Sequence, residues 1–227
     1  HLYAASPNSY VLSAVQRLPI QTDETDLKGH NMAKPSPDKE RQMLGLFLLP
    51  GVYLRVLADT VKRLGHDDRR LYEGLSFAPD ELQAADSRVF VTDAIIFADR
   101  AMAMAGKDGL SFLLARELRV TIHGTLGFAA LTSPTVGGAL DSVRRYLQLR
   151  APFLSLVMRD TGEHMLVQLR SEFEVPGLYH FLAETVMATL VMLAEQLVDR
   201  DSASELGFTL ENGKLPGVTA RLSCPEP

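Results

Sequence analysis

The sequence predicts an α+β fold that is mostly helical, with a small antiparallel β-sheet packed against a long buried helix. Three features predict it. Apolar residues recur at helical spacing through most of residues 51–150, apolar and polar residues alternate within 153–170, and residues 178–200 are apolar almost all round. A helix that is apolar all round must be covered on several sides, so we expect it at the centre of the domain.

Helices are predicted over residues 51–64, 92–105, 109–118 and 133–150, with shorter helical turns at 67–74 and from Pro79. Gly65 and Gly106 follow two of these segments, and glycine is favoured just beyond a helix end. Thr92 is the expected cap of the second helix. Ser133-Pro134 predicts the start of the last one, because the serine hydroxyl can accept from a free backbone amide and proline suits the first helical turn.

Two closely spaced glycines, Gly124 and Gly127, mark residues 121–130. Such glycines let helices approach closely in lipid. In a soluble chain they indicate either a tight packing site or a turn, and the sequence leaves both open.

The pattern changes from helical to alternating after Pro152. Residues 153–159 and 164–170 flank the turn Asp160-Thr-Gly-Glu163, which predicts an antiparallel hairpin. In its second strand Met165, Val167 and Leu169 share one face, as expected of a half-buried strand. Residues 218–224 also alternate and are predicted to join the same sheet.

The first part of the chain has no sustained periodicity. We interpret residues 1–48 as an irregular extension with one short helix at 10–18, and residues 49–227 as the folded domain. The extension is either an arm that reaches a partner subunit or a tail ordered only by packing.

Composition excludes several classes of function. The net charge of −5 lacks the basic field that phosphate binding requires, so we expect this chain to bind DNA poorly by itself. A single cysteine, Cys224, allows no internal disulfide and no cysteine zinc site, which favours the cytoplasm. The six histidines show no metal-ligand spacing, and no catalytic motif is present. We therefore predict no enzyme, no metal and no cofactor.

A membrane span is also not predicted. The most apolar window, residues 178–198, carries His180, Glu184 and Glu195, which indicates a buried helix.

The middle of the sequence resembles a known family. The run from Gly124 through Leu131-Thr-Ser-Pro-Thr135 to Tyr146-Leu147, followed by the hairpin, is similar to the N-terminal regulatory, arabinose-binding-like domain of AraC-type bacterial transcriptional regulators. The similarity begins near Gly51-Val-Tyr-Leu-Arg55 and covers about residues 49–227. In the family, the segment like residues 223–227 precedes a pair of helix-turn-helix units. The resemblance implies that this DNA-binding pair is absent from the chain.

The resemblance also implies a function. Such a domain binds a small-molecule effector, forms a homodimer, or both, and controls promoter DNA binding by the absent C-terminal domain. We expect an amphipathic or largely apolar effector with one anionic end, in a pocket between the hairpin, the 133–150 helix and the long helix that is lined by Leu, Met and Phe. The alternative is a ligand-independent module for dimerisation or protein interaction. A lined cavity favours the sensor, whereas a solid core with an exposed apolar face favours the interaction module.

Candidate effector-binding residues can be named, each with a structural alternative. They are Tyr53, His123, Phe128, Arg145, Tyr146, Arg150, Met158, Met165 and Tyr179. An arginine could pair with an effector carboxylate or only offset a helix dipole. The tyrosines and methionines suit a pocket as well as a core. His123 is interpreted first as a core or turn histidine whose nitrogens are satisfied.

Overall fold

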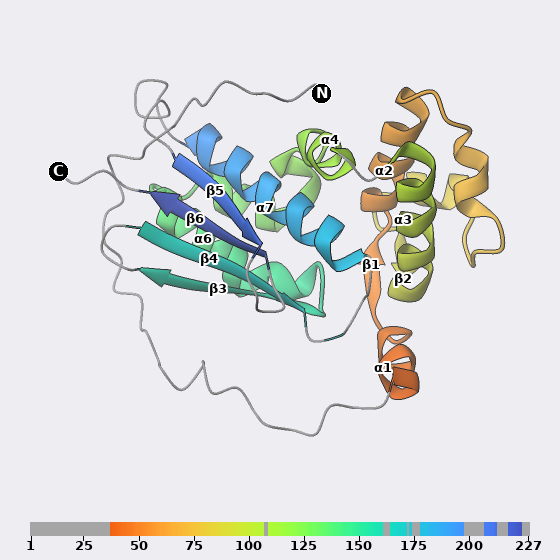
Figure 1. Cartoon of the computed structure of the whole chain (residues 1–227), viewed down its shortest axis with the longest axis horizontal. Helices are drawn as coiled ribbons and strands as arrows, with labels where there is room; N and C mark the ends of the chain where they lie inside the picture. Colours follow the sequence, from red (N-terminus) through yellow and green to blue (C-terminus); the bar gives the residue numbers. More distant parts are fainter. Residues whose placement is uncertain are drawn as a thin grey trace.

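The computed structural model describes residues 37–106, 109–160, 164–171, 173, 178–197, 207–212 and 218–223. It confirms an α+β fold that is mostly helical, with two small antiparallel sheets. The short helix predicted at 10–18 lies outside the described residues. The described chain forms an N-terminal lobe, residues 37–106, and a C-terminal lobe, residues 109–223, which lie side by side (Figure 1).

The N-terminal lobe is a small helical unit with a two-stranded sheet. Its elements are α1 (Pro37–Leu44), β1 (Leu48–Pro50), α2 (Val52–Arg63), η2 (Asp68–Tyr72), η3 (Pro79–Gln83), β2 (Arg88–Phe90) and α3 (Val91–Ala105). Strands β1 and β2 pair antiparallel, so α2 begins beside the start of β2 and α3 begins beside the start of β1. Helix α1 falls within the predicted irregular extension, and its Leu44 is buried against the lobe.

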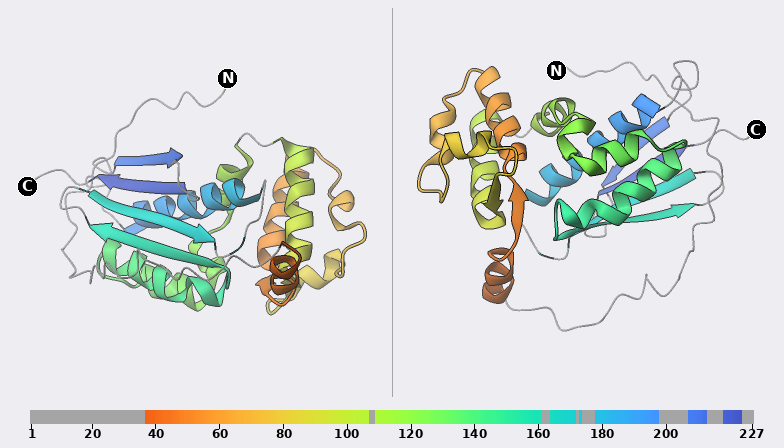
Figure 2. Two further views of the ribbon diagram at one scale, coloured as in Figure 1. Left: turned by 60° about the horizontal axis from the view of Figure 1, so that its bottom comes forward. Right: turned by 180° about the vertical axis from the view of Figure 1, so that it is seen from behind.

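The C-terminal lobe contains four α-helices and a four-stranded sheet. Its elements are α4 (Leu110–Glu117), η4 (Val120–His123), α5 (Thr125–Leu131), α6 (Val136–Tyr146), η5 (Leu147–Leu149), β3 (Leu154–Asp160), β4 (His164–Ser171), α7 (Leu178–Leu197), β5 (Gly207–Asn212) and β6 (Val218–Ser223). The helices lie on one face of the sheet (Figure 2).

The sheet has the order β3-β4-β6-β5, and every pair is antiparallel. The predicted hairpin and the strand at 218–223 are confirmed. Leu156 and Leu169 are cross-strand partners, and both are buried under the helices. Strand β5 was not predicted. Phe208 and Leu210 alternate with Thr209 and Glu211, but this alternation is short, and the strand pairs with β6 at the sheet edge.

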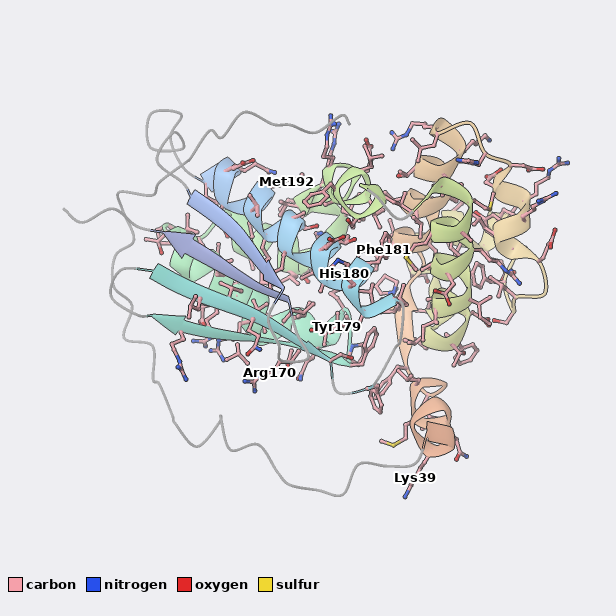
Figure 3. All side chains as sticks on the ribbon, viewed as in Figure 1. Lys39, Arg170, Tyr179, His180, Phe181 and Met192 are labelled. Carbon is pink, nitrogen blue, oxygen red and sulfur yellow. The ribbon has the colours of Figure 1, made fainter. Side chains whose placement is uncertain are left out.

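Helix α7 is the central helix that its composition predicts. It packs against α4 and lies over β4 and β6, and Met187 and Ala183 are fully buried. Near its start, Phe181 is buried whereas His180 is exposed (Figure 3). In the described part of the chain, α7 alone has the length and hydropathy of a membrane span, but half of it is buried inside the protein, as in a core helix.

Two predicted helix caps were wrong. Thr92 does not cap α3, because β2 runs directly into the helix and the N-cap residue is Phe90. Ser133 does not cap α6: the Thr135 hydroxyl accepts from the Gly138 amide at 3.1 Å, and the Ser133 hydroxyl donates to the Ala129 carbonyl at the end of α5.

Both expectations for residues 121–130 are found. Gly124 makes the turn between η4 and α5 with a φ of 62°, a conformation that suits glycine. Gly127 is the packing site, since a Cβ there would lie 1.8 Å from the Val120 carbonyl oxygen. The helix α5 itself was not predicted.

Candidate ligand-binding cavity

A cavity of about 180 Å³ lies between the two lobes. Its walls come from α2 and α3 on one side and from α5, α6, η5 and α7 on the other. An apolar cavity of about 150 Å³ is enough to bind a molecule of benzene's size. The cavity can therefore hold a small organic ligand in contact with both lobes.

Most of the wall is hydrocarbon. Representative lining residues are Leu54 and Leu57 of α2, Ala94 and Ala98 of α3, and Leu182 and Val186 of α7. The lining positions on α7 run from Leu178 to Leu193. At 1.5 Å per residue this is about 22 Å of helix, so the apolar wall is long.

Two polar residues of this wall are satisfied within α7. The hydroxyl of Thr185 donates to the Phe181 carbonyl, and that of Thr189 donates to the Thr185 carbonyl, both at 2.8 Å. These threonines therefore offer the cavity no free hydrogen-bond donor.

The remaining polar groups are gathered at one place, which we call the polar end: Tyr53, His123 and Arg150. Arg150 Nε donates to the Tyr53 hydroxyl oxygen at 3.1 Å, and that oxygen lies 3.1 Å from His123 Nδ1. Arg150 Nη2 donates to the Ile122 carbonyl at 3.1 Å. The guanidinium carbon also lies 5.4 Å from the centre of the Tyr53 ring, within cation–π range.

This network joins the three side chains through the Tyr53 oxygen. That oxygen accepts from Arg150, and it lies 3.1 Å from His123 Nδ1, which accepts the tyrosine proton in one histidine tautomer and donates to the oxygen in the other. The other ring nitrogen, Nε2, is buried without a well-formed hydrogen bond. The expectation of a core or turn histidine at this position stays a prediction.

Burial keeps the two ring groups neutral. Burial, and secondarily the Arg150 charge, lower the pKa of His123 to about 4. Hydrogen bonding to the Leu118 backbone opposes this shift. Burial also raises the pKa of Tyr53, against the opposing effect of Arg150. Arg150 thus carries the formal charge of the polar end, and none of the described carboxylates forms an ion pair with it.

Local structure explains how these three side chains meet. Tyr53 lies in the first turn of α2, and Arg150 directly follows η5. His123 ends η4, where the Gly124 turn begins α5. The close contact of Gly127 with Val120 holds η4 against α5 and so positions His123.

The other predicted site residues lie elsewhere. Phe128 and Tyr146 are 59% and 47% exposed on the outer surfaces of α5 and α6. Arg145 is exposed and pairs with Asp141 at 2.6 Å. Met158 is half-buried against the core without lining the cavity.

Tyr179 also lies apart from the cavity lining, and the structure does not place the side chain of Met165. The Tyr179 hydroxyl reaches from the start of α7 to the Leu169 carbonyl of β4 at 2.8 Å (Figure 3). Met165 pairs with Asp160 and Leu222 in the sheet, and its side chain lies outside the described residues.

The expected walls of the pocket differ from those observed. The hairpin contributes Leu154, but α2 and α3 of the N-terminal lobe form a whole wall that was not predicted. No methionine is among the described lining residues. The small side chains Ala94 and Ala98 leave the space beside α7 that larger residues would fill. Their positions become meaningful only once α3 is known to face α7.

Comparison with known proteins defines the class. Residues 65–217 match the arabinose-binding domain found at the N-terminus of AraC transcription regulators. The chain belongs to this family, and it is a ligand-sensing regulatory domain of a family that comprises transcription regulators and not enzymes.

A particular relative extends the comparison. The chain is 31% identical over 155 residues to the ornithine utilization regulator of Pseudomonas aeruginosa. The match covers 66% of this chain and 44% of the relative, so the chain spans less than half of that regulator's length.

Proposed function

We propose that this chain senses a small, amphipathic or apolar effector in the cavity between its lobes and thereby controls DNA binding by a separate domain of the full-length regulator. The observation that carries the proposal is the long apolar cavity with a single polar end. Because both lobes line the cavity, an effector there contacts each of them. The bound effector stabilises the arrangement of the two lobes to which it binds more tightly. This raises the population of that arrangement, to which the DNA-binding domain responds.

The chemistry of the cavity argues against the two compounds that the comparisons name. A sugar such as arabinose needs many hydrogen bonds, whereas the wall is mostly hydrocarbon. Ornithine carries two ammonium groups, and the described lining has no carboxylate to pair with them. We expect neither L-arabinose nor L-ornithine to raise the melting temperature of the chain.

The family supports a proposal for the assembly of the chain and for its place in the cell. We propose that the chain acts in the cytoplasm as a homodimer, the commonest symmetric assembly, and contacts promoter DNA only through the separate domain. The net charge of −5 agrees with poor DNA binding by the chain alone. Sedimentation velocity tests the dimer, with a monomer at micromolar concentration as the contradicting result.

The experiment that tests the cavity is native mass spectrometry with a variant that fills it. Ala98 lines the cavity on α3, whereas Ala103 on the same helix is exposed. We expect Ala98→Leu to abolish binding of small apolar molecules extracted from the native host and added back to the chain. We expect Ala103→Leu to leave binding unchanged. Equal binding by both variants would place the effector site elsewhere.

A further inference from the structure

The polar end of the cavity contains a positive charge that lacks a negative partner. Arg150 is half-buried, and it donates hydrogen bonds to two neutral groups, the Tyr53 hydroxyl and the Ile122 carbonyl. A guanidinium removed from water is normally paired with a carboxylate or phosphate. Among the described residues no carboxylate fills that role.

The groups beside Arg150 place its charge at the cavity. Arg150 Nε donates to the Tyr53 hydroxyl, which also contacts His123 Nδ1, so the charge lies next to two neutral rings of the cavity wall. The Nε2 atom of His123 is enclosed by the protein and does not face the cavity. A guanidinium at such a position suits an anionic oxygen acceptor.

The rest of the cavity limits what can be attached to that acceptor. The wall along α7 is apolar over about 22 Å, and its threonine hydroxyls are already bonded. A second polar group on the ligand would therefore be buried without a partner. The cavity is suited to one charged head and one hydrocarbon body.

We propose that the effector is a monocarboxylic acid with a hydrocarbon body, whose carboxylate is bound by Arg150. This inference rests on the proposed function, since it concerns the same cavity. It adds the chemical class of the ligand and the residue that recognises its head. Tyr53 is a positioning residue, because its hydroxyl accepts from Arg150 Nε.

The test is a calorimetric titration of the 227-residue chain with three matched series. These are the straight-chain carboxylates from hexanoate to dodecanoate, the corresponding primary alcohols, and the corresponding primary amines. At the best chain length we expect the carboxylate to bind at least about ten-fold more tightly than the alcohol, and the amine not to bind. A carboxylate preference of less than two-fold, or no binding by any carboxylate, would overturn the proposal.

Variants separate this proposal from the proposed function. We expect Arg150→Met to remove the preference for the carboxylate over the alcohol while alcohol binding remains. Arg145→Met is the matched control, because that arginine is exposed and already paired with Asp141. If the wild-type chain binds alcohols and shows no preference for the carboxylate, the carboxylate class is refuted while the cavity remains the effector site. Alcohol binding that persists in Ala98→Leu would refute the cavity as the site.

A spectroscopic readout tests the proposed contact directly. With carboxyl-¹³C-labelled carboxylate, we expect the bound head to stay ionised at a pH where the free acid is protonated, because Arg150 favours the anion. A bound carboxylate that becomes protonated at the same pH as the free acid would contradict the contact with Arg150.

Discussion

Two arginines five residues apart occupy opposite environments in this domain. On the outer face of α6, Arg145 lies in solvent and pairs with Asp141, which also binds Arg144. At the polar end of the cavity, Arg150 is half-buried beside Tyr53 and the described chain gives it no acidic partner. The charge of Arg145 is neutralised within the protein, whereas that of Arg150 is not neutralised by any described residue. An incomplete charge beside a cavity therefore distinguishes a binding group from a surface charge.

The largest expected effect on stability comes from displacing η4, the segment that carries His123 at the polar end. In Gly127→Ala the new Cβ would meet the Val120 carbonyl, so the backbone of η4 or α5 has to shift. We expect a loss of about 3 kcal/mol of unfolding free energy, measured by urea denaturation.

Gly138→Ala is the matched control, because a Cβ there would lie 3.3 Å from the Thr135 hydroxyl in an otherwise ordinary helix. It should change stability by less than about 1 kcal/mol. Equal effects of the two substitutions would show that the close approach at Gly127 does not hold η4 in place.

The second effect is a pH dependence from His123. Its pKa is about 4 in the folded chain and 6.5 as the ordinary value, so the unfolded state takes up the proton first as pH falls. The contribution of His123 to the unfolding free energy does not change above pH 6.5. It falls as the pH is lowered from 6.5 to 4 and is constant again below pH 4. Between pH 7 and pH 5 we expect a loss of about 2 kcal/mol that is missing in His123→Phe.

His180 supplies the control for this prediction, because it is exposed and pairs with Glu184. His180→Gln should retain the fall in stability. If His123→Phe shows the same fall as wild type, the histidine at the polar end is not buried in its neutral form.

The smallest effect compares the two arginines directly. Arg150→Met removes the hydrogen bonds to Tyr53 and to the Ile122 carbonyl, while relief of an unpaired charge offsets part of that loss. We expect it to lower the unfolding free energy by about 1 kcal/mol in the ligand-free chain. Arg145→Met should change it by less than about 0.5 kcal/mol, as for exposed ion pairs. Thermal denaturation in low salt measures both, and a larger loss for Arg145→Met would reverse the assignment.

Elements with strong local patterns could be predicted from the sequence. The hairpin, the all-round apolar α7 and the strand at 218–223 each follow from their own residues. Strand β5 could not be predicted, because its pairing with β6 stabilises it more than its local pattern does. Capping also failed locally, since the contacts that replace Thr92 and Ser133 depend on the neighbouring elements β2 and α5.

The candidate site was predictable only in part, for a related reason. Residue chemistry was enough to nominate Tyr53, His123 and Arg150, but it nominated Arg145 and Tyr146 on the same grounds. Burial separates these groups, and burial depends on how η5 and η4 pack against α2. The apolar wall on α3 was missed because its small side chains form a cavity only when they face α7.

A crystal structure of the chain grown with its tightest-binding straight-chain carboxylate is the most direct test of the cavity as the effector site. We predict that the hydrocarbon body lies between α3 and α7 and that the carboxylate is within hydrogen-bond distance of Arg150. An empty cavity, with the ligand bound instead on the outer surface of α5 and α6, would contradict the assignment.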